Sequence, residues 1–145
     1  MREALHLAAR AAAAGDVPVG AVVVRHGAIV GAGANRTLRD QDPTAHAELL
    51  AVRAASATLG TWRLEQCTLV VTLEPCAMCA GALVLARVDR VVFGAFDDKA
   101  GMAGSVGDIL RHPRLNHRPE VVPGVLAETA SQLLRDFFAA RRAIG

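Results

Sequence analysis

Two short segments, residues 43–48 and 74–79, constrain the fold of this chain more than any other feature. The first reads Pro-Thr-Ala-His-Ala-Glu and the second reads Glu-Pro-Cys-Ala-Met-Cys. Each lies where a loop or strand is expected to run into a helix, and His46 and Cys76 are thirty residues apart. These side chains can act on one ligand only if the fold brings the two helix starts together.

The spacing of apolar residues predicts helices that alternate with strands. Residues 2–14 are rich in Ala and have helical periodicity, and the β-branched run at residues 17–24 is typical of a strand. Thr44 suits the N-cap of the second helix, and Pro75 suits the first turn of the third. We expect helices at 2–14, 44–58, 76–86, 108–112 and 127–142, strands at 17–24, 28–33, 68–73, 88–95 and 120–122, and loops at 35–43 and 97–107.

The first two strands form a predicted hairpin, because Arg25-His26-Gly27 supplies a turn between them. The later strands alternate with helices, and such connections are right-handed crossovers between parallel strands. The chain is therefore predicted to be an α/β protein, a three-layer α/β/α sandwich with a five-stranded mixed sheet. Its 145 residues are expected to form a single domain, residues 1–145.

Composition excludes several classes of protein. With 52% apolar and 21% charged residues, the chain has the material for a real core and is not disordered. The Ala-rich start lacks the features of a signal peptide, and no apolar run is long enough to cross a bilayer. We therefore expect a cytoplasmic protein with no membrane partner. Three cysteines make an odd count, which argues for metal binding or catalysis rather than a disulfide framework.

Cys76 and Cys79 lie three residues apart in the predicted first turn of a helix. At this spacing both side chains project from one face, and the positive end of the helix dipole favours their thiolate forms. His46 adds an imidazole from the start of the neighbouring helix. One nitrogen and two sulfurs suit zinc, and three protein ligands leave a fourth position for water, as in catalytic sites.

Glu48 follows His46 by two residues, and in an ideal helix the two side chains point roughly 160° apart. Glu48 is therefore predicted to approach the zinc-bound water from another side rather than to bind the metal. A carboxylate there can take a proton from the water and return it to a leaving group. His-x-Glu followed by Pro-Cys-x-x-Cys is typical of zinc-dependent nucleobase deaminases.

Two other interpretations of these residues are open. A lone histidine near a helix start is usually only hydrogen-bonded, and the paired motifs are what favour a ligand role for His46. Cys67 could supply a fourth ligand and make the zinc purely structural. Because structural sites favour closely spaced ligand pairs and Cys67 precedes Cys76 by nine residues, we expect Cys67 to be a small buried apolar residue.

Over nearly its whole length the chain resembles the bacterial tRNA-specific adenosine deaminases (TadA-type) of the cytidine-deaminase-like superfamily. The zinc motifs alone fit cytidine, deoxycytidylate or guanine deaminases equally well. The parts that favour the tRNA enzymes are Asn116-His117-Arg118 and the pair Phe137-Phe138 with Arg141-Arg142. The segments that carry the resemblance are 16–21, 42–48, 71–81, 91–95, 116–118, 137–138 and 141–142.

The resemblance implies hydrolytic, zinc-dependent deamination of adenosine to inosine at the wobble position of a tRNA anticodon. It also implies one zinc ion per chain, an anticodon stem-loop as partner, and a homodimer. In this reaction hydroxide attacks C6 of adenine, while Glu48 protonates the adjacent ring nitrogen and then the departing ammonia. The alternatives are deamination of a free base or nucleotide (cytidine, deoxycytidylate or guanine) and a catalytically inactive zinc module that only binds RNA.

The resemblance also implies which residues contact the flipped base. Asn35 is expected to hydrogen-bond it, and Pro18 and Val19 are expected to help line the pocket. Ala47, between the histidine and the glutamate of the first motif, is assigned to the same pocket. For Pro18 the alternative is that it only shapes the entry to a strand.

Other contacts implied by the resemblance lie beyond the base. Asp97 and Lys99 are expected in a loop that meets the RNA, and Phe138 is expected beside the neighbouring nucleotides. Phe138 could equally be a core residue. Few aromatic residues are available for stacking on unpaired bases, and Phe96 and Trp62 are conditional candidates whose alternatives are a loop anchor and ordinary core packing.

Charge supports an RNA partner only through its distribution. The formal net charge is +2, which does not by itself indicate nucleic-acid binding. Basic residues are concentrated at 111–118 and 135–142, and these clusters coincide with the segments that resemble the tRNA enzymes. We therefore expect both clusters to take part in RNA binding rather than to be solvated faces.

Overall fold

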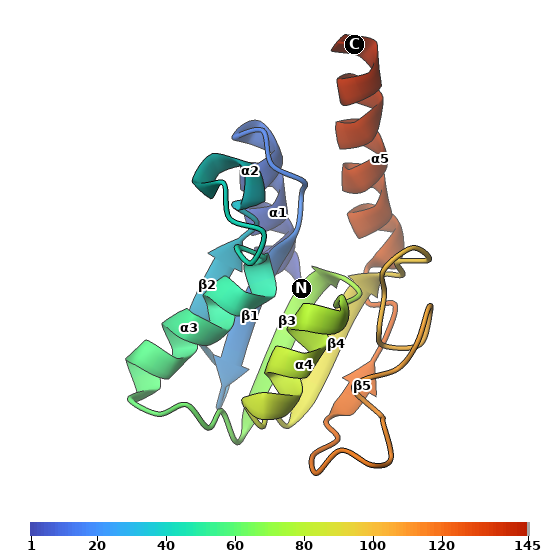
Figure 1. Cartoon of the computed structure of the whole chain (residues 1–145). Coiled ribbons are helices and arrows are strands. Elements are labelled where there is room, and N and C mark those ends of the chain that lie inside the picture. The colour runs from blue at the N-terminus through green and yellow to red at the C-terminus, as the bar shows by residue number, and fades with distance from the viewer. Residues whose placement is uncertain (145) are drawn as a thin grey trace.

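The five predicted strands form one mixed sheet in the computed structural model, which describes residues 1–144 (Figure 1). The strands are β1 (Gly20–Arg25), β2 (Ala28–Ala34), β3 (Cys67–Leu73), β4 (Arg90–Ala95) and β5 (Glu120–Val122). Their order across the sheet is β2-β1-β3-β4-β5. β1 pairs antiparallel with β2 and with β3, whereas β3, β4 and β5 run parallel, so the prediction of a mixed sheet is confirmed.

Helices cover both faces of this sheet, which confirms the three-layer α/β/α architecture (Figure 1). The helices are α1 (Arg2–Ala13), α2 (Thr37–Asp40), α3 (Ala47–Leu59), α4 (Ala77–Leu85) and α5 (Ala127–Ile144). α1 and α5 pack on one face, and α3 packs with α4 on the other. The packing is close: a Cβ at Gly20 would lie 2.0 Å from the α1 carbonyl of Ala4, and one at Gly33 would lie 2.6 Å from the α3 carbonyl of Ala47.

The topology brings two helix starts to one edge of the sheet. β2 and β3 are each antiparallel to β1, so both strands point the same way and end at the same edge. The chain enters α3 from the end of β2 through a loop that contains α2, and it enters α4 directly from the end of β3. Fully buried alanines of α3 and apolar residues of β1, β3 and β4 form one core behind this edge. The segments 43–48 and 74–79 therefore meet.

Several predicted helix boundaries are wrong. Thr44 does not cap α3, because its N–H and hydroxyl both donate to Asp42 Oδ1 and the N-cap position is occupied by His46. Pro75 lies outside α4, since the N-cap is Cys76 in an extended conformation. His46 and Cys76 are thus the N-cap residues of α3 and α4 rather than residues of the first helical turn.

The loops also differ from prediction. Residues 108–112 form turns instead of a helix, because Asp108 pairs in a β-bridge with Ala103 and accepts the backbone N–H of Arg111. α2 lies inside the predicted loop 35–43. Strand β1 starts only at Gly20, after the Val19 N–H donates to the Val17 carbonyl in a tight turn. β4 likewise begins two residues later than predicted.

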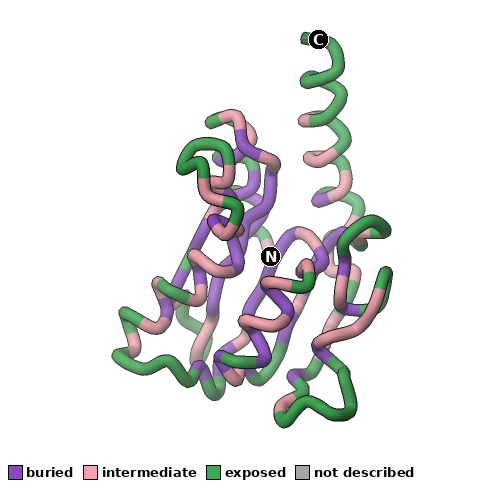
Figure 2. Tube along the Cα trace, viewed as in Figure 1, coloured by how far each residue is buried: buried purple, intermediate pink, exposed green. Residues whose placement is uncertain are grey.

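The C-terminal half of α5 extends beyond the sheet, and most of its residues are exposed (Figures 1 and 2). Its first half packs against β4 through Ala130. Farther along, Arg141 donates a hydrogen bond to the Gly15 carbonyl at the end of α1. Among residues 1–144, none of the helices combines the length and the apolar character that a bilayer span requires.

Candidate active site

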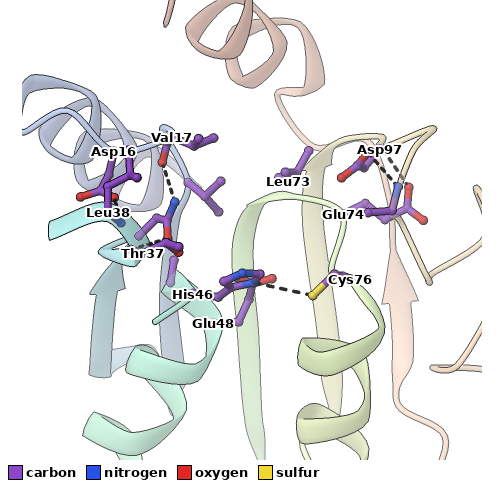
Figure 3. Close-up of a pocket in the computed structure, with 14 residues that line it drawn as sticks. Asp16, Val17, Thr37, Leu38, His46, Glu48, Leu73, Glu74, Cys76 and Asp97 are labelled. Carbon is purple, nitrogen blue, oxygen red and sulfur yellow. Dashed lines mark hydrogen bonds between the residues drawn. The ribbon is translucent and has the colours of Figure 1, made fainter. Parts of the chain in front are cut away.

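His46, Cys76 and Cys79 lie together at the edge of the sheet where α3 and α4 begin. His46 Nδ1 is 3.6 Å from Cys76 Sγ and 3.5 Å from Cys79 Sγ. The three ligand atoms all lie within 4.8 Å of one another, and Figure 3 shows His46 facing Cys76 across the pocket floor. Cys79 is fully buried, and Cys76 is partly exposed. The two cysteines and the histidine thus form one compact donor set.

This donor set fits zinc. Tetrahedral bonds of about 2.3 Å to sulfur and 2.0–2.1 Å to nitrogen separate the N and S atoms of neighbouring ligands by about 3.6 Å. The two observed N···S distances agree with that value. The ligand set His/Cys/Cys leaves one tetrahedral position for water or substrate. The site can therefore hold a zinc ion of the open, catalytic kind.

Cys67 does not belong to this group. It lies at the start of β3, whereas the site lies beyond the other end of that strand. The Cys67 side chain is fully buried in the main core, and burial raises the pKa of its thiol. The alternative of a closed structural zinc with Cys67 as fourth ligand is wrong, and its interpretation as a small buried residue is confirmed.

The electrostatics of the donor set favour a thiolate. A hydrogen bond from the Cys79 thiol, together with one from the His46 ring, lowers the pKa of Cys76 to about 4. The pKa of Cys79 is raised in turn, because its thiol donates to Cys76 and is buried. The hydrogen bond to Cys76 also raises the pKa of His46. A metal cation would replace the protons that these groups share.

Glu48 is buried beside the donor set, with 4% of its surface exposed. Burial is the main cause that raises the pKa of Glu48 to about 7. A carboxyl group with this pKa can both accept and donate a proton near neutral pH. The helical angle of about 160° between His46 and Glu48 does not apply, because His46 is the extended N-cap of α3 and not a helical residue.

His46, Glu48 and Cys76 lie on the floor of a cavity of about 410 Å³ (Figure 3). The α1–β1 and β2–α2 connections and the start of α2 line one wall. The end of β3 and the β3–α4 and β4–β5 connections line the other. The floor consists of His46, Ala47, Glu48 and Cys76; the first wall of Asp16, Val17, Val19, Asn35, Thr37 and Leu38; the second wall of Leu73, Glu74, Asp97 and Ala100.

A hydrogen-bond network fixes the Asn35 amide in the first wall. Its Oδ1 accepts the backbone N–H and the hydroxyl of Thr37, and its Nδ2 donates to the Val17 carbonyl. Both oxygen lone pairs are therefore used, while Nδ2 retains a second N–H. The fully buried Asp16 carboxylate accepts the Leu38 N–H and pairs with Arg39, which ties α2 to the α1–β1 connection.

The Glu74 carboxylate organises the second wall in a comparable way. It is 2% exposed and accepts hydrogen bonds from Asp97, Ala103 and Ser105. Neither Asp16 nor Glu74 was predicted to have a role, although Glu74 opens the motif segment 74–79 and Asp16 opens segment 16–21, which carries part of the resemblance. The available signal was a carboxylate next to a buried apolar strand, where burial without partners would be costly.

The structure brings some of the predicted substrate contacts to this pocket and leaves others outside it. Asn35, Val19, Ala47 and Asp97 are lining residues. Pro18 lies between two lining residues and is not itself among them. Lys99 and Phe138 instead line a separate, open groove along α5, together with Arg135 and Arg142.

The basic cluster at 111–118 does not lie at the pocket. Its last residues precede β5, and β5 pairs in parallel with the start of β4, so residues 116–118 are at the opposite edge of the sheet from the end of β4 (Figure 1). Asn116 accepts a hydrogen bond from Arg87 there, and His117 Nε2 lies 2.6 Å from the Val88 carbonyl. Arg111, at the other end of the cluster, pairs with Asp108 and donates a hydrogen bond to the carbonyl of Ala103, beside the second wall. These contacts tie the segment to its own surroundings.

Trp62 and Phe96 are both exposed. Trp62 has 62% of its surface exposed and lies between the end of α3 and the start of β3, far along both elements from the pocket. Core packing is therefore the wrong explanation for Trp62, whose ring is instead covered by Arg63 at 5.2 Å. Phe96 packs edge-on against Phe93, with ring centroids 5.3 Å apart, which anchors the loop next to Asp97.

Comparison with known proteins agrees with this geometry. Residues 1–95 match the family model of the cytidine and deoxycytidylate deaminase zinc-binding region. The chain is 51% identical over 138 residues to a tRNA-specific adenosine deaminase of Bacillus subtilis, covering 95% of this chain and 86% of the relative. The chain therefore belongs to the zinc-binding cytidine and deoxycytidylate deaminase family, within the group that contains the bacterial tRNA-specific adenosine deaminases.

Solved structures show the same fold. One, from a study of A-to-I editing by tRNA A34 deaminases at the wobble position, superposes with a TM-score of 0.86 at 38% identity and covers 92% of this chain and 97% of that one. A guanine deaminase from Nitrosomonas europaea superposes with a TM-score of 0.80 at 31% identity, covering 95% of this chain and 82% of the other. Members of the family thus act on different bases with a shared architecture.

Proposed function

We propose that the protein deaminates adenosine to inosine at the wobble position of a tRNA anticodon. The observation that carries the proposal is the buried Glu48 beside a His/Cys/Cys group on the floor of a base-sized cavity. Identity of 51% to a tRNA-specific adenosine deaminase over most of both chains supports adenosine in tRNA as the substrate. The free-base alternative is kept in the test, because guanine deaminase shares the fold.

His46, Cys76 and Cys79 would hold one zinc ion per chain. When bound, zinc lowers the pKa of a coordinated water and so supplies the nucleophile near neutral pH. The Cys76 thiol already has a low pKa, which favours the thiolate that a metal needs. The packed core behind the starts of α3 and α4 would keep the three ligand atoms in place before the substrate binds.

Glu48 would move the protons of the reaction. Its pKa of about 7 would allow it to accept one proton from water and donate it to the ring nitrogen beside the reacting carbon. It would then carry the proton of the hydroxyl added to that carbon to the departing ammonia. Water supplies the oxygen of inosine and ammonia leaves, so atoms and charge balance. Burial of Glu48 at the floor excludes bulk water from this exchange.

Asn35 would recognise the base. Because its Oδ1 is used by Thr37, the remaining Nδ2 hydrogen can donate only to an acceptor atom of the substrate. Val19 and Ala47 line the cavity as apolar contacts, and Pro18 shapes the turn that places Val19 there. Together they would bind a flat base whose edge carries an acceptor.

An anticodon stem-loop would extend from the pocket along α5. Asp97 lies on the pocket rim, and Lys99, Arg135 and Arg142 line the adjacent groove with Phe138, which is 43% exposed. Basic side chains suit phosphates, and an exposed ring suits an unpaired base. Residues 111–118 line neither the pocket nor this groove, so an RNA contact of that cluster would lie outside both.

We also propose a homodimer in the cytoplasm, formed by single-domain chains. α4 contains no charged residue, and Leu85 on its outer side is 73% exposed. An uncharged exposed helix face suits contact with another subunit. Light scattering at working concentration checks the dimer, and a monomer would contradict it.

The substrate is tested by four parallel incubations. The zinc-loaded protein is mixed with an anticodon stem-loop with adenosine at the wobble position, cytidine, deoxycytidylate or guanine, and ammonia and inosine are measured. We expect inosine in the stem-loop and no ammonia from the other three. Ammonia from a free base or nucleotide alone would refute the tRNA substrate. Zinc at one equivalent per chain without any turnover would favour an inactive RNA-binding module.

A further inference from the structure

We propose that Glu74 is a positioning residue that holds the second wall of the pocket, residues 97–105, in the shape that binds the substrate. Glu74 begins the β3–α4 connection, two residues before Cys76. Its four side-chain hydrogen bonds all go to residues 97–105. Its role would be to place Asp97 and Ala100 on the pocket rim. This inference rests on the RNA substrate proposed above.

The Glu74 carboxylate is the acceptor in all four of its side-chain hydrogen bonds. Oε1 accepts the Asp97 N–H at 3.0 Å and the Ser105 hydroxyl, and Oε2 accepts the N–H groups of Ala103 at 3.0 Å and Ser105 at 3.1 Å. Every partner is a donor. Three of the donors are backbone groups of one segment, so a single carboxylate closes that segment at both of its ends.

The segment wraps closely around the carboxylate. A Cβ at Gly101 would lie 2.3 Å from Glu74 Cδ and 2.5 Å from Oε2, so only glycine allows this approach. The Met102 N–H donates to the Pro75 carbonyl, which adds a backbone tie beside the carboxylate. Residues 97–105 thus surround the Glu74 carboxylate, which belongs to the same motif segment as the proposed metal ligands Cys76 and Cys79.

The direction of these bonds explains why the residue must be a glutamate. A glutamine has the same shape but only one oxygen. In either orientation of its amide, an NH₂ group would face two of the four donors. Those donors would lose their acceptor in a buried place, which is costly. The segment would then sample other conformations, and substrate binding would have to order it again.

Glu74→Gln is therefore the decisive variant. In the zinc-loaded protein we expect an increase of about tenfold in KM for the stem-loop, with a smaller change in kcat, because the floor is intact. Zinc content should stay that of the parent. Amide hydrogen exchange should become faster at Asp97, Ala103 and Ser105, while exchange in α3 is unchanged.

Ser105→Ala provides a graded second variant that does not depend on the stability of the first. It removes one of the four hydrogen bonds and keeps the Ser105 backbone N–H on Oε2. We expect a change in KM of the same sign and smaller size. The matched control is Glu65→Gln, which alters an exposed glutamate whose ion-pair partner among residues 1–144 is Arg63. This control should behave like the parent.

The outcomes separate this inference from the proposed function. Unchanged KM and unchanged exchange in Glu74→Gln, or a loss of kcat without a change in KM, would overturn the positioning role. If the parent forms no inosine from the stem-loop, the proposed function fails by itself. The exchange measurements still decide whether Glu74 holds the wall, because they need no substrate.

Discussion

Two buried glutamates line the same pocket, but the pKa of one is raised and the pKa of the other is lowered. Glu48 on the floor is 4% exposed, and burial raises its pKa to about 7. Glu74 in the wall is 2% exposed, and desolvation would likewise raise its pKa. Its hydrogen bonds from Ser105, Asp97 and Ala103 together outweigh that cost, and the pKa lies below its usual value. Burial alone therefore does not decide the charge of a carboxylate; the number of donors around it does.

The difference separates two tasks. A carboxyl group that titrates near neutral pH can exchange protons with a substrate, whereas one that stays ionised can only hold its partners. Glu48 has the first property and Glu74 has the second. The same residue type thus serves proton transfer on the floor and loop geometry in the wall.

The largest expected effect separates the two residues by activity. Glu48→Gln keeps the shape of the side chain and removes the proton carrier, so turnover should fall by about 10²–10⁴-fold while zinc remains bound. Glu74→Gln should retain most of its kcat. Inosine formation under saturating stem-loop, with zinc measured in parallel, checks this contrast. Full activity of Glu48→Gln would remove its assigned role.

A second contrast concerns stability after zinc is removed with a chelator. The folded-state pKa of Glu48 is raised, so its ionisation destabilises the fold as pH rises from about 4 to 7. Zinc-free Glu48→Gln should therefore be more stable than the zinc-free parent at pH 8, and this gain should disappear near pH 4. Denaturant unfolding at several pH values measures it. Equal stability at pH 8 would contradict the buried-charge explanation.

Glu74→Gln should shift stability in the opposite direction. The folded-state pKa of Glu74 is lowered, so its contribution is present above the unfolded value of about 4.3 and is lost as pH falls through the folded value. At neutral pH we expect a loss of about 1–3 kcal/mol in the free energy of unfolding. The same unfolding series measures it, and the difference from the parent should shrink in acid. A difference independent of pH would point to packing instead.

The smallest effect should come from displacing the wall without changing either glutamate. Gly101→Ala adds a methyl group that must move away from Glu74 Cδ and from the Asp97 carbonyl. We expect about 1–3 kcal/mol of lost stability and a rise in KM for the stem-loop that is smaller than in Glu74→Gln. Gly81→Ala is the control for an added methyl group that meets no atom of residues 1–144 outside its own helix within 4 Å, and as a mid-helix change it should raise stability by about 0.5–1 kcal/mol. Identical behaviour of both variants would show that the close approach at Gly101 is unimportant.

Local patterns predicted much of the fold. Apolar runs and the turn at residues 25–27 predicted all five strands, and the alternation with helices predicted the mixed sheet and its covered faces. Boundaries were less predictable where side chains compete for backbone groups. Asp42 takes the Thr44 N–H and moves the cap of α3 to His46, and Asp108 forms turns where a short helix was predicted.

The sequence by itself determined the donor set, because His46, Cys76, Cys79 and Glu48 stand in short motifs whose spacing and chemistry can be read locally. Only the tertiary structure decided what surrounds them. It buried Asp16 and Glu74 as the acceptors that hold the two walls, and it placed residues 116–118 at the far edge of the sheet. The reason is physical: a motif records which atoms can react, whereas a wall depends on hydrogen bonds between residues more than twenty positions apart.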